Sequence, residues 1–69
     1  MENLLQKFGL HLASIRQSKG LSQEQLAETS GLHRTYISSL ERGKRNPTIV
    51  TLSALSDALN ISLSELIDF

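Results

Sequence analysis

The sequence predicts an all-α fold of five short helices. Apolar residues recur at helical spacing in each of five segments, and no segment shows the alternating pattern of a strand. Four residues of helix-capping type precede such segments: Asn3, Ser22, Thr48 and Ser62. Residues that tolerate a left-handed backbone follow three of them: Gly20, Gly31 and Asn60. The helices are therefore delimited at both ends by residue chemistry.

The first helix is expected to run from about Asn3 to Lys19. A stripe with spacings of three and four residues marks its buried side, and this stripe contains Leu5, Phe8, Leu12 and Ile15. Gly9 lies inside this helix, where glycine costs about 1 kcal/mol relative to alanine. A glycine there would permit close packing against another element.

The second helix has three agreeing signals at its start. Ser22 and Gln25 form an S-x-x-Q capping box, and Leu21 and Leu26 occupy the positions of a hydrophobic staple. We expect this helix to end just before Gly31, which terminates helices without a Cβ clash.

The third helix, residues 34–42, is predicted to bury Ile37 and Leu40 and to expose a polar face. That outward face carries Thr35, Ser38, Ser39 and Arg42, with Arg34 at its edge in the first turn. Two helices joined by a glycine turn, here over residues 22–43, form an arrangement that can place the second helix in a DNA groove. A polar helix face is also commonly just a solvated surface, and this alternative remains open.

Side-chain chemistry indicates what this face would do on DNA. Arg34 is the best candidate for a bidentate contact to guanine, worth about 1 to 3 kcal/mol of discrimination. Thr35 offers a methyl and a hydroxyl, while Ser38 and Ser39 are short donors to bases or phosphates. Two neighbouring residues are ambiguous. His33 is expected at the N-cap as a cap or phosphate neighbour, and Tyr36 either packs half-buried or reaches a phosphate or base with its hydroxyl.

The C-terminal third predicts two more helices. Thr48 caps the fourth, whose core residues are Leu52, Leu55 and Leu59. Ser62 and Glu65 form a second capping box, which starts a short fifth helix. This helix is expected to carry Leu66, Ile67 and Phe69.

Composition excludes several classes of function. The 69 residues contain no cysteine, so neither a disulfide nor a thiolate metal site is available. His11 and His33 are not spaced as a metal pair, and no nucleophile elbow or phosphate-binding loop occurs. We therefore expect no enzyme, no metal, no cofactor and no small-molecule ligand. No apolar run approaches a membrane span, which favours a cytoplasmic protein without a membrane partner.

Charge is distributed unevenly although the formal net charge is zero. Residues 34–47 contain four basic side chains, Arg34, Arg42, Lys44 and Arg45, against one acid, Glu41. Residues 48–69 contain three acids and no base. One end is thus predicted to attract DNA and the other to repel it, which would orient the protein on a duplex.

The run from Ile15 to Ser62 resembles the lambda-repressor-like, Cro/CI-type helix-turn-helix family. Within it, the segment 33–38 followed by Glu41-Arg42 and Arg45-Asn46 looks most like the controller proteins of restriction-modification systems. The resemblance implies a compact five-helix domain over residues 1–69, of prokaryotic or phage origin. It also implies that Arg16 forms a structural ion pair with Glu41 inside the fold.

The resemblance also assigns roles on double-stranded DNA. Gln23 would touch a phosphate, with Arg34, Thr35, Tyr36 and Ser39 facing the major groove. Four residues would lie along the sugar-phosphate backbone of the DNA: Arg42, Lys44, Arg45 and Asn46.

A single recognition helix reads few base pairs, so the resemblance implies a homodimer on an operator with inverted symmetry. Leu63, Ile67 and Phe69 are the residues we expect at its interface, whereas Leu66 is expected to close the monomer core. Regulation would be steric exclusion of RNA polymerase or, for a controller, contact with it. Two alternatives remain: a DNA-binding domain excised from a longer protein, and an antitoxin-like interaction module of the same fold with DNA binding secondary.

Overall fold

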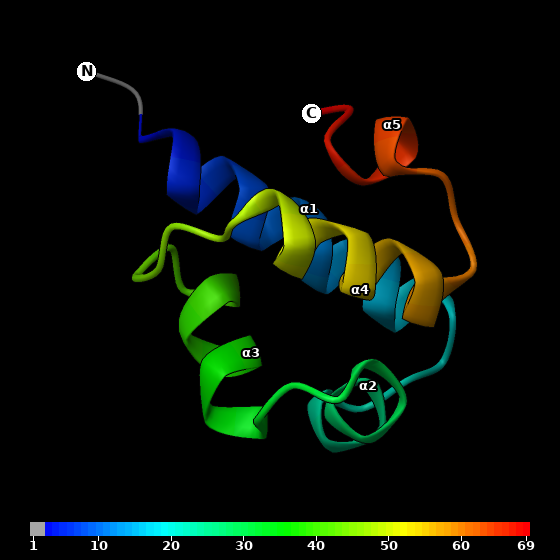
Figure 1. The fold of residues 1–69 in the computed structure, drawn as a ribbon. Coiled ribbons are helices and arrows are strands. Elements are labelled where there is room, and N and C mark those ends of the chain that lie inside the picture. Colours follow the sequence, from blue (N-terminus) through cyan, green and yellow to red (C-terminus); the bar gives the residue numbers. More distant parts are fainter. Residues whose placement is uncertain (1–2) are drawn as a thin grey trace.

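The computed structural model describes residues 3–69 and confirms the all-α class, with five helices and no strand over that range. The helices are α1 (Leu4–Ser18), α2 (Gln23–Ser30), α3 (Arg34–Glu41), α4 (Ile49–Leu59) and α5 (Leu63–Leu66). Figure 1 shows α2 and α3 together on one side of the molecule and α5 on the other.

Capping side chains set most of these boundaries, as the sequence predicts. Ser22 Oγ accepts the N–H of Gln25 at 3.0 Å, while Gln25 Oε1 accepts the N–H of Ser22 at 2.8 Å. The Ser62 box is formed in the same way, and Thr48 Oγ1 accepts the N–H of Thr51 at 3.1 Å. These bonds satisfy backbone donors that the first turn of a helix leaves unpaired.

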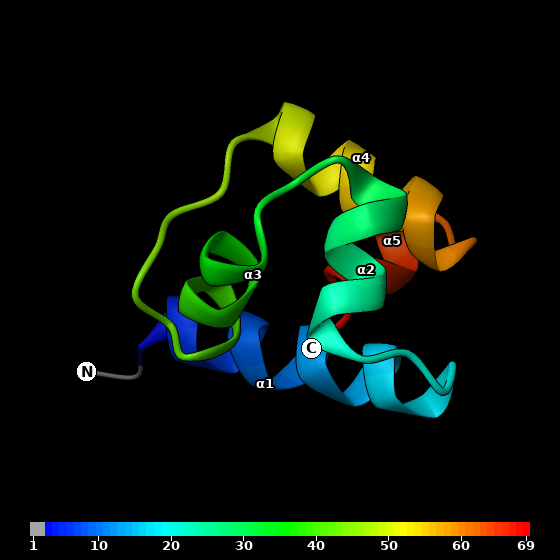
Figure 2. The ribbon, with the colours of Figure 1, turned by 90° about the horizontal axis from the view of Figure 1, so that it is seen from below.

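The helices enclose one core between α1 and α4. These two helices overlap in Figure 1 but lie on opposite sides of the molecule in Figure 2, so the core fills the space between them. The side chains that fill it come from all five helices: Phe8, Leu12, Leu26, Ala27, Ile37, Leu40, Leu55, Leu59 and Leu66. The predicted apolar stripes are confirmed, with Leu5, Ile15 and Leu52 half-buried at the edges of the core.

Gly9 sets the distance between α1 and α3. A Cβ atom built at this position would lie 2.4 Å from the carbonyl oxygen of Glu41 and 2.5 Å from that of Leu40. Both are backbone atoms at the C-terminal end of α3, which packs against α1 and α2. The absence of a side chain therefore allows the close approach that fixes where α3 lies, and the predicted reason for this glycine is confirmed.

The fifth helix is shorter than the sequence pattern predicts. It ends at Leu66, so the expectation that it also carries Ile67 and Phe69 is wrong. In a continued helix the N–H of Phe69 would donate to the carbonyl of Glu65, but it donates to the carbonyl of Ile67 at 3.2 Å. The Glu65 carbonyl instead bonds to His11 Nε2 at 2.9 Å. Phe69 instead folds back, with its ring centroid 6.1 Å from that of Phe8 and 5.6 Å from that of His11. Contacts with α1 thus replace the last helical turn.

Candidate nucleic-acid interface

The outward face of α3 presents polar side chains, because Ile37 and Leu40 bury the opposite face completely. Arg34, Thr35 and Arg42 are exposed, whereas Ser38 and Ser39 are half-buried. Ser39 Oγ donates to the carbonyl of Thr35 at 2.9 Å, which leaves its oxygen free to accept a bond. The residues predicted to face a DNA groove therefore lie together on one accessible surface.

Arg34 is connected to the first turn of α2 through Gln23. Its Nη1 lies 3.4 Å from Gln23 Oε1, and Gln23 Nε2 donates to Glu41 Oε1 at 2.9 Å. The bond to the carboxylate orients the Gln23 amide, so that its oxygen faces the guanidinium of Arg34. One N–H of the amide remains for another acceptor, which is compatible with the phosphate contact predicted for Gln23.

The predicted ion pair between Arg16 and Glu41 is present and nearly buried. Arg16 Nε donates to Glu41 Oε2 at 2.6 Å and Nη2 to Oε1 at 3.1 Å, with side-chain exposures of 11% and 7%. Arg16 Nη1 also donates to the carbonyl of Leu21 at 2.7 Å. One guanidinium thereby joins α1, the loop that follows it and the end of α3.

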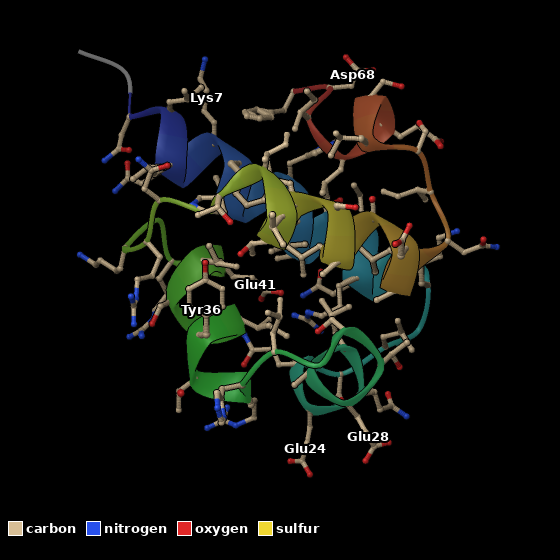
Figure 3. All side chains as sticks on the ribbon, viewed as in Figure 1. Lys7, Glu24, Glu28, Tyr36, Glu41 and Asp68 are labelled. Carbon is tan, nitrogen blue, oxygen red and sulfur yellow. The ribbon has the colours of Figure 1, made fainter. Side chains whose placement is uncertain are left out.

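This pairing changes the charge of the surface. Glu41 is the one acid in residues 34–47, and in Figure 3 its side chain points towards the interior. Its charge is balanced by Arg16, so the four basic residues of that segment have no exposed acid among them: Arg34, Arg42, Lys44 and Arg45. Glu24 and Glu28 point outward from α2, and Asp68 lies at the far end of the molecule (Figure 3).

His33 and Tyr36 are ambiguous in the sequence and occupy defined positions in the structure. His33 is the N-cap residue of α3, but its side chain makes no capping hydrogen bond. Tyr36 is half-buried and packs against the core, while its ring lies 5.3 Å from the guanidinium carbon of Arg45. Both line a concavity of about 480 Å³ with Thr35, Ser39, Arg45 and Thr51.

Two features of this surface were not predicted from the sequence. Thr51 lines the concavity from the first turn of α4, and the only related signal in the sequence is the capping residue Thr48, which predicts where α4 begins. The contact between Tyr36 and Arg45 joins a helix to a loop nine residues away, and helical periodicity does not report on such pairs.

The residues predicted for a dimer interface lie away from α3. Leu63 is half-buried, whereas Ile67 is 49% exposed and Phe69 is 47% exposed despite its contacts with α1. Leu66 is fully buried, in agreement with its predicted place in the monomer core.

Residues 3–69 contain neither a cluster of metal-ligating side chains nor a helix that could span a membrane. No group of histidine, aspartate or glutamate side chains in that range is arranged to hold a metal ion. Within the same range, every helix is too short or too polar to cross a membrane.

Comparison with known proteins gives consistent matches. The profile of the family described as Helix-turn-helix matches residues 12–66. Control protein C.SmaI of Serratia marcescens is 56% identical over 57 residues, which cover 83% of this chain and 68% of that protein. Control protein C.BamHI of Bacillus amyloliquefaciens is 44% identical over 68 residues, covering 97% and 84%.

A solved structure resembles the whole arrangement of helices. The crystal structure of the restriction-modification controller protein C.AhdI from Aeromonas hydrophila superposes with a TM-score of 0.88 at 50% identity. The match covers 90% of this chain and 94% of that one. The predicted resemblance to controller proteins is therefore confirmed in both sequence and structure.

Proposed function

The chain belongs to the helix-turn-helix family of DNA-binding transcriptional regulators, and from this premise we propose that it is a controller-type regulator that reads its operator with α3. The observation that carries the proposal is the outward face of α3. There an arginine in the first turn contacts Gln23, and Glu41, the one acid in residues 34–47, is turned inward and paired with Arg16. Side chains in the first turn of a recognition helix are those that meet base edges.

We assign base contacts to Arg34, Thr35 and Ser39, and Ser38 lies on the same face. The flanking residues are assigned to the phosphate backbone: Gln23, His33, Arg42, Lys44, Arg45 and Asn46. Phosphate contacts fix register and orientation, while base contacts carry the sequence information.

The proposed operator has inverted symmetry and binds two copies of the chain. Half-sites about one helical turn apart, roughly 34 Å, would place two α3 helices in successive major grooves on one side of the duplex. Ile67 and Phe69 are exposed apolar residues at the end of the molecule away from α3, which supports an interface there between the two copies. Leu63 lies at the edge of this surface.

Control of transcription would follow from occupancy of the operator in the cytoplasm of a prokaryotic cell. A dimer that covers a promoter excludes RNA polymerase, whereas a dimer at a neighbouring site can touch the polymerase and recruit it. The proposal includes no enzymatic activity, no cofactor and no small-molecule ligand.

Replacing Arg34 and Lys44 in parallel tests the proposed readout. Arg34→Ala should lower affinity for the operator by about 1 to 3 kcal/mol and relax the preference at one base pair of each half-site. Lys44→Ala should weaken binding to all sequences alike and reduce the slope of log affinity against log salt by about one unit per protomer. The measurement is titration of each variant with a duplex selected from a random pool, with single-base-pair variants of it, at several salt concentrations.

Equal weakening of Arg34→Ala on every sequence would show that Arg34 contacts only phosphate, and the assignment of α3 as the reading helix would then fail. Absence of binding by the unaltered chain to any selected duplex would overturn the proposal as a whole.

A second candidate function is an antitoxin-like module whose main partner is another protein. The exposure of Ile67 and Phe69 is the observation that favours it. In that case, substitutions on the C-terminal apolar surface would abolish capture of a partner, while Arg34→Ala would leave it intact.

A further inference from the structure

Tyr36 and Arg45 form a contact that the assigned roles do not explain. The guanidinium carbon of Arg45 lies 5.3 Å from the centroid of the Tyr36 ring. This is within the distance of about 6 Å at which an aromatic face attracts a cation. The pair joins α3 to the loop of residues 42–48, which connects α3 to α4.

The two partners differ in their freedom to move. The Tyr36 ring is half-buried and packs against the core, so its position is set by the fold. Arg45 is exposed on a loop whose beginning is fixed by the N–H of Lys44, which donates to the carbonyl of Ser39 at 2.9 Å. The Tyr36 ring therefore restricts the position of the Arg45 guanidinium, and not the reverse.

Arg45 is held without using its hydrogen-bond donors. Within residues 3–69 its side chain makes neither a hydrogen bond nor an ion pair, whereas Arg16 uses Nε, Nη1 and Nη2 on two acceptor residues. A guanidinium carries five N–H donors in a planar fork that matches the oxygens of a phosphate. A positioned guanidinium with open donors fits an anionic ligand with several acceptor oxygens.

The position of the pair indicates which anion this is. Tyr36 and Arg45 line the concavity of about 480 Å³ with Thr35, Ser39 and Thr51, directly beside the outward face of α3. When a recognition helix lies in the major groove, the residues beside it face the sugar-phosphate backbone. The ligand is therefore a phosphate of the same duplex.

We propose that Tyr36 is a positioning residue, whose ring holds Arg45 ready to bind a backbone phosphate. This inference rests on the proposed function of α3 and refines it, since Tyr36 then acts through Arg45 and not through a base or a phosphate of its own. Holding a long side chain in its bound position before DNA arrives reduces the entropy that binding must overcome.

Two substitutions of Tyr36 separate the effect of its ring from that of its hydroxyl, and a third substitution removes Arg45. Tyr36→Phe keeps the ring, so its affinity should stay within about twofold of the unaltered protein. Tyr36→Leu removes the aromatic face and should weaken binding about two- to fivefold per protomer, equally on the selected duplex and on a shuffled duplex. Arg45→Ala should also weaken both duplexes equally and reduce the salt slope by about one unit per protomer.

The decisive variant combines Tyr36→Leu with Arg45→Ala. Its affinity should equal that of Arg45→Ala alone, because the ring has nothing left to hold. Any loss of folding caused by Tyr36→Leu would be the same in both backgrounds, so a purely structural effect would add in the double variant. Unfolding curves of all four variants show whether such an effect is present.

Three outcomes would overturn the inference: additive losses in the double variant, a loss in Tyr36→Phe as large as in Tyr36→Leu, or a Tyr36→Leu effect confined to one base pair. Each of them leaves the proposed function intact, since that function is tested by Arg34→Ala. An unaltered sequence preference in Arg34→Ala would instead overturn the assignment of α3 as the reading helix, on which this inference rests.

Discussion

At the scale of single residues, one glycine and one ion pair decide where α3 lies. Gly9 has no Cβ, and the carbonyls of Leu40 and Glu41 occupy the space that a Cβ would need. The Arg16–Glu41 pair then fixes the same end of α3 from the side. Both features concern the C-terminal end of the helix, while Gln23 supports Arg34 at its other end.

Gly9→Ala tests this close approach. Alanine has higher helix propensity by about 1 kcal/mol, but its Cβ would lie 2.4 Å from a backbone oxygen, so α1 and α3 must separate. Overpacking of this kind costs about 1 to 3 kcal/mol, and we expect the clash to outweigh the propensity gain. Urea unfolding measures the difference.

The matched control is Leu10→Ala, one position further along α1, where the side chain is exposed. A surface change of this kind should alter stability by no more than about 0.5 kcal/mol. A Gly9→Ala protein as stable as the Leu10→Ala protein would show that α3 moves without cost.

At the scale of elements, the two capping boxes differ in one chemical respect. The box of α2 ends in Gln25, whereas the box of α5 ends in Glu65, whose carboxylate can be titrated. Hydrogen bonds from the backbone N–H and the hydroxyl of Ser62 lower the pKa of Glu65 below its ordinary value of 4.5, and Lys19 adds a smaller favourable charge. The capping box of α5 thus contains a titratable group, while the capping box of α2 does not.

Because the pKa of Glu65 is lower in the folded state, its contribution to stability is present above pH 4.5 and is lost as the pH falls through the folded value. Glu65→Gln keeps an acceptor for the N–H of Ser62 but removes the charge. At neutral pH the unaltered protein should therefore be the more stable of the two, and the difference should shrink on acidification. Urea midpoints of both proteins over a pH series measure it, and a difference that does not change with pH would contradict this account.

Helix boundaries are easier to predict from this sequence than contacts between helices. Caps and glycines are local, so Ser22, Gly31, Thr48 and Ser62 predicted boundaries that the structure confirms. The end of α5 does not follow from the local pattern, because it involves distant contacts with α1: His11, 54 residues away in the chain, bonds to the carbonyl of Glu65, and Phe69 packs against Phe8. The Tyr36–Arg45 and Gln23–Glu41 contacts are likewise set by packing and not by periodicity.

At the scale of the whole molecule, the basic surface around α3 and the exposed residues at the C-terminus lie apart. Arg34, Arg42, Lys44 and Arg45 gather around α3 and the loop that follows it, whereas Asp68 lies at the other end with the neighbouring Ile67 and Phe69. This separation was predictable from the sequence for charge, since it follows the order of residues along the chain. The proposed duplex-binding surface and the proposed dimer surface can then be occupied together.

Ile67→Asp tests the proposed dimer. Ile67 is 49% exposed, so a carboxylate there is tolerated in the monomer but would be desolvated and repelled by its copy in an interface. We expect sedimentation to show the variant as a monomer at concentrations where the unaltered protein is a dimer.

Val50→Asp is the control, because Val50 is 74% exposed and lies in the first turn of α4, where an acid is favourable. Its oligomeric state should equal that of the unaltered protein. A dimer that persists in Ile67→Asp would exclude this surface as the interface.

The contacts of α1 have a mechanical consequence. Gly9 packs against α3, and His11, two positions later, bonds to the carbonyl of Glu65 in α5. The single helix α1 therefore contacts both α3 and α5 and connects them rigidly. In the proposed dimer, the distance and the relative orientation of the two α3 helices are then nearly fixed. An extra base pair between the half-sites increases their distance and also rotates one half-site about the duplex axis. A dimer with α3 helices in fixed positions cannot fit both half-sites after these two changes.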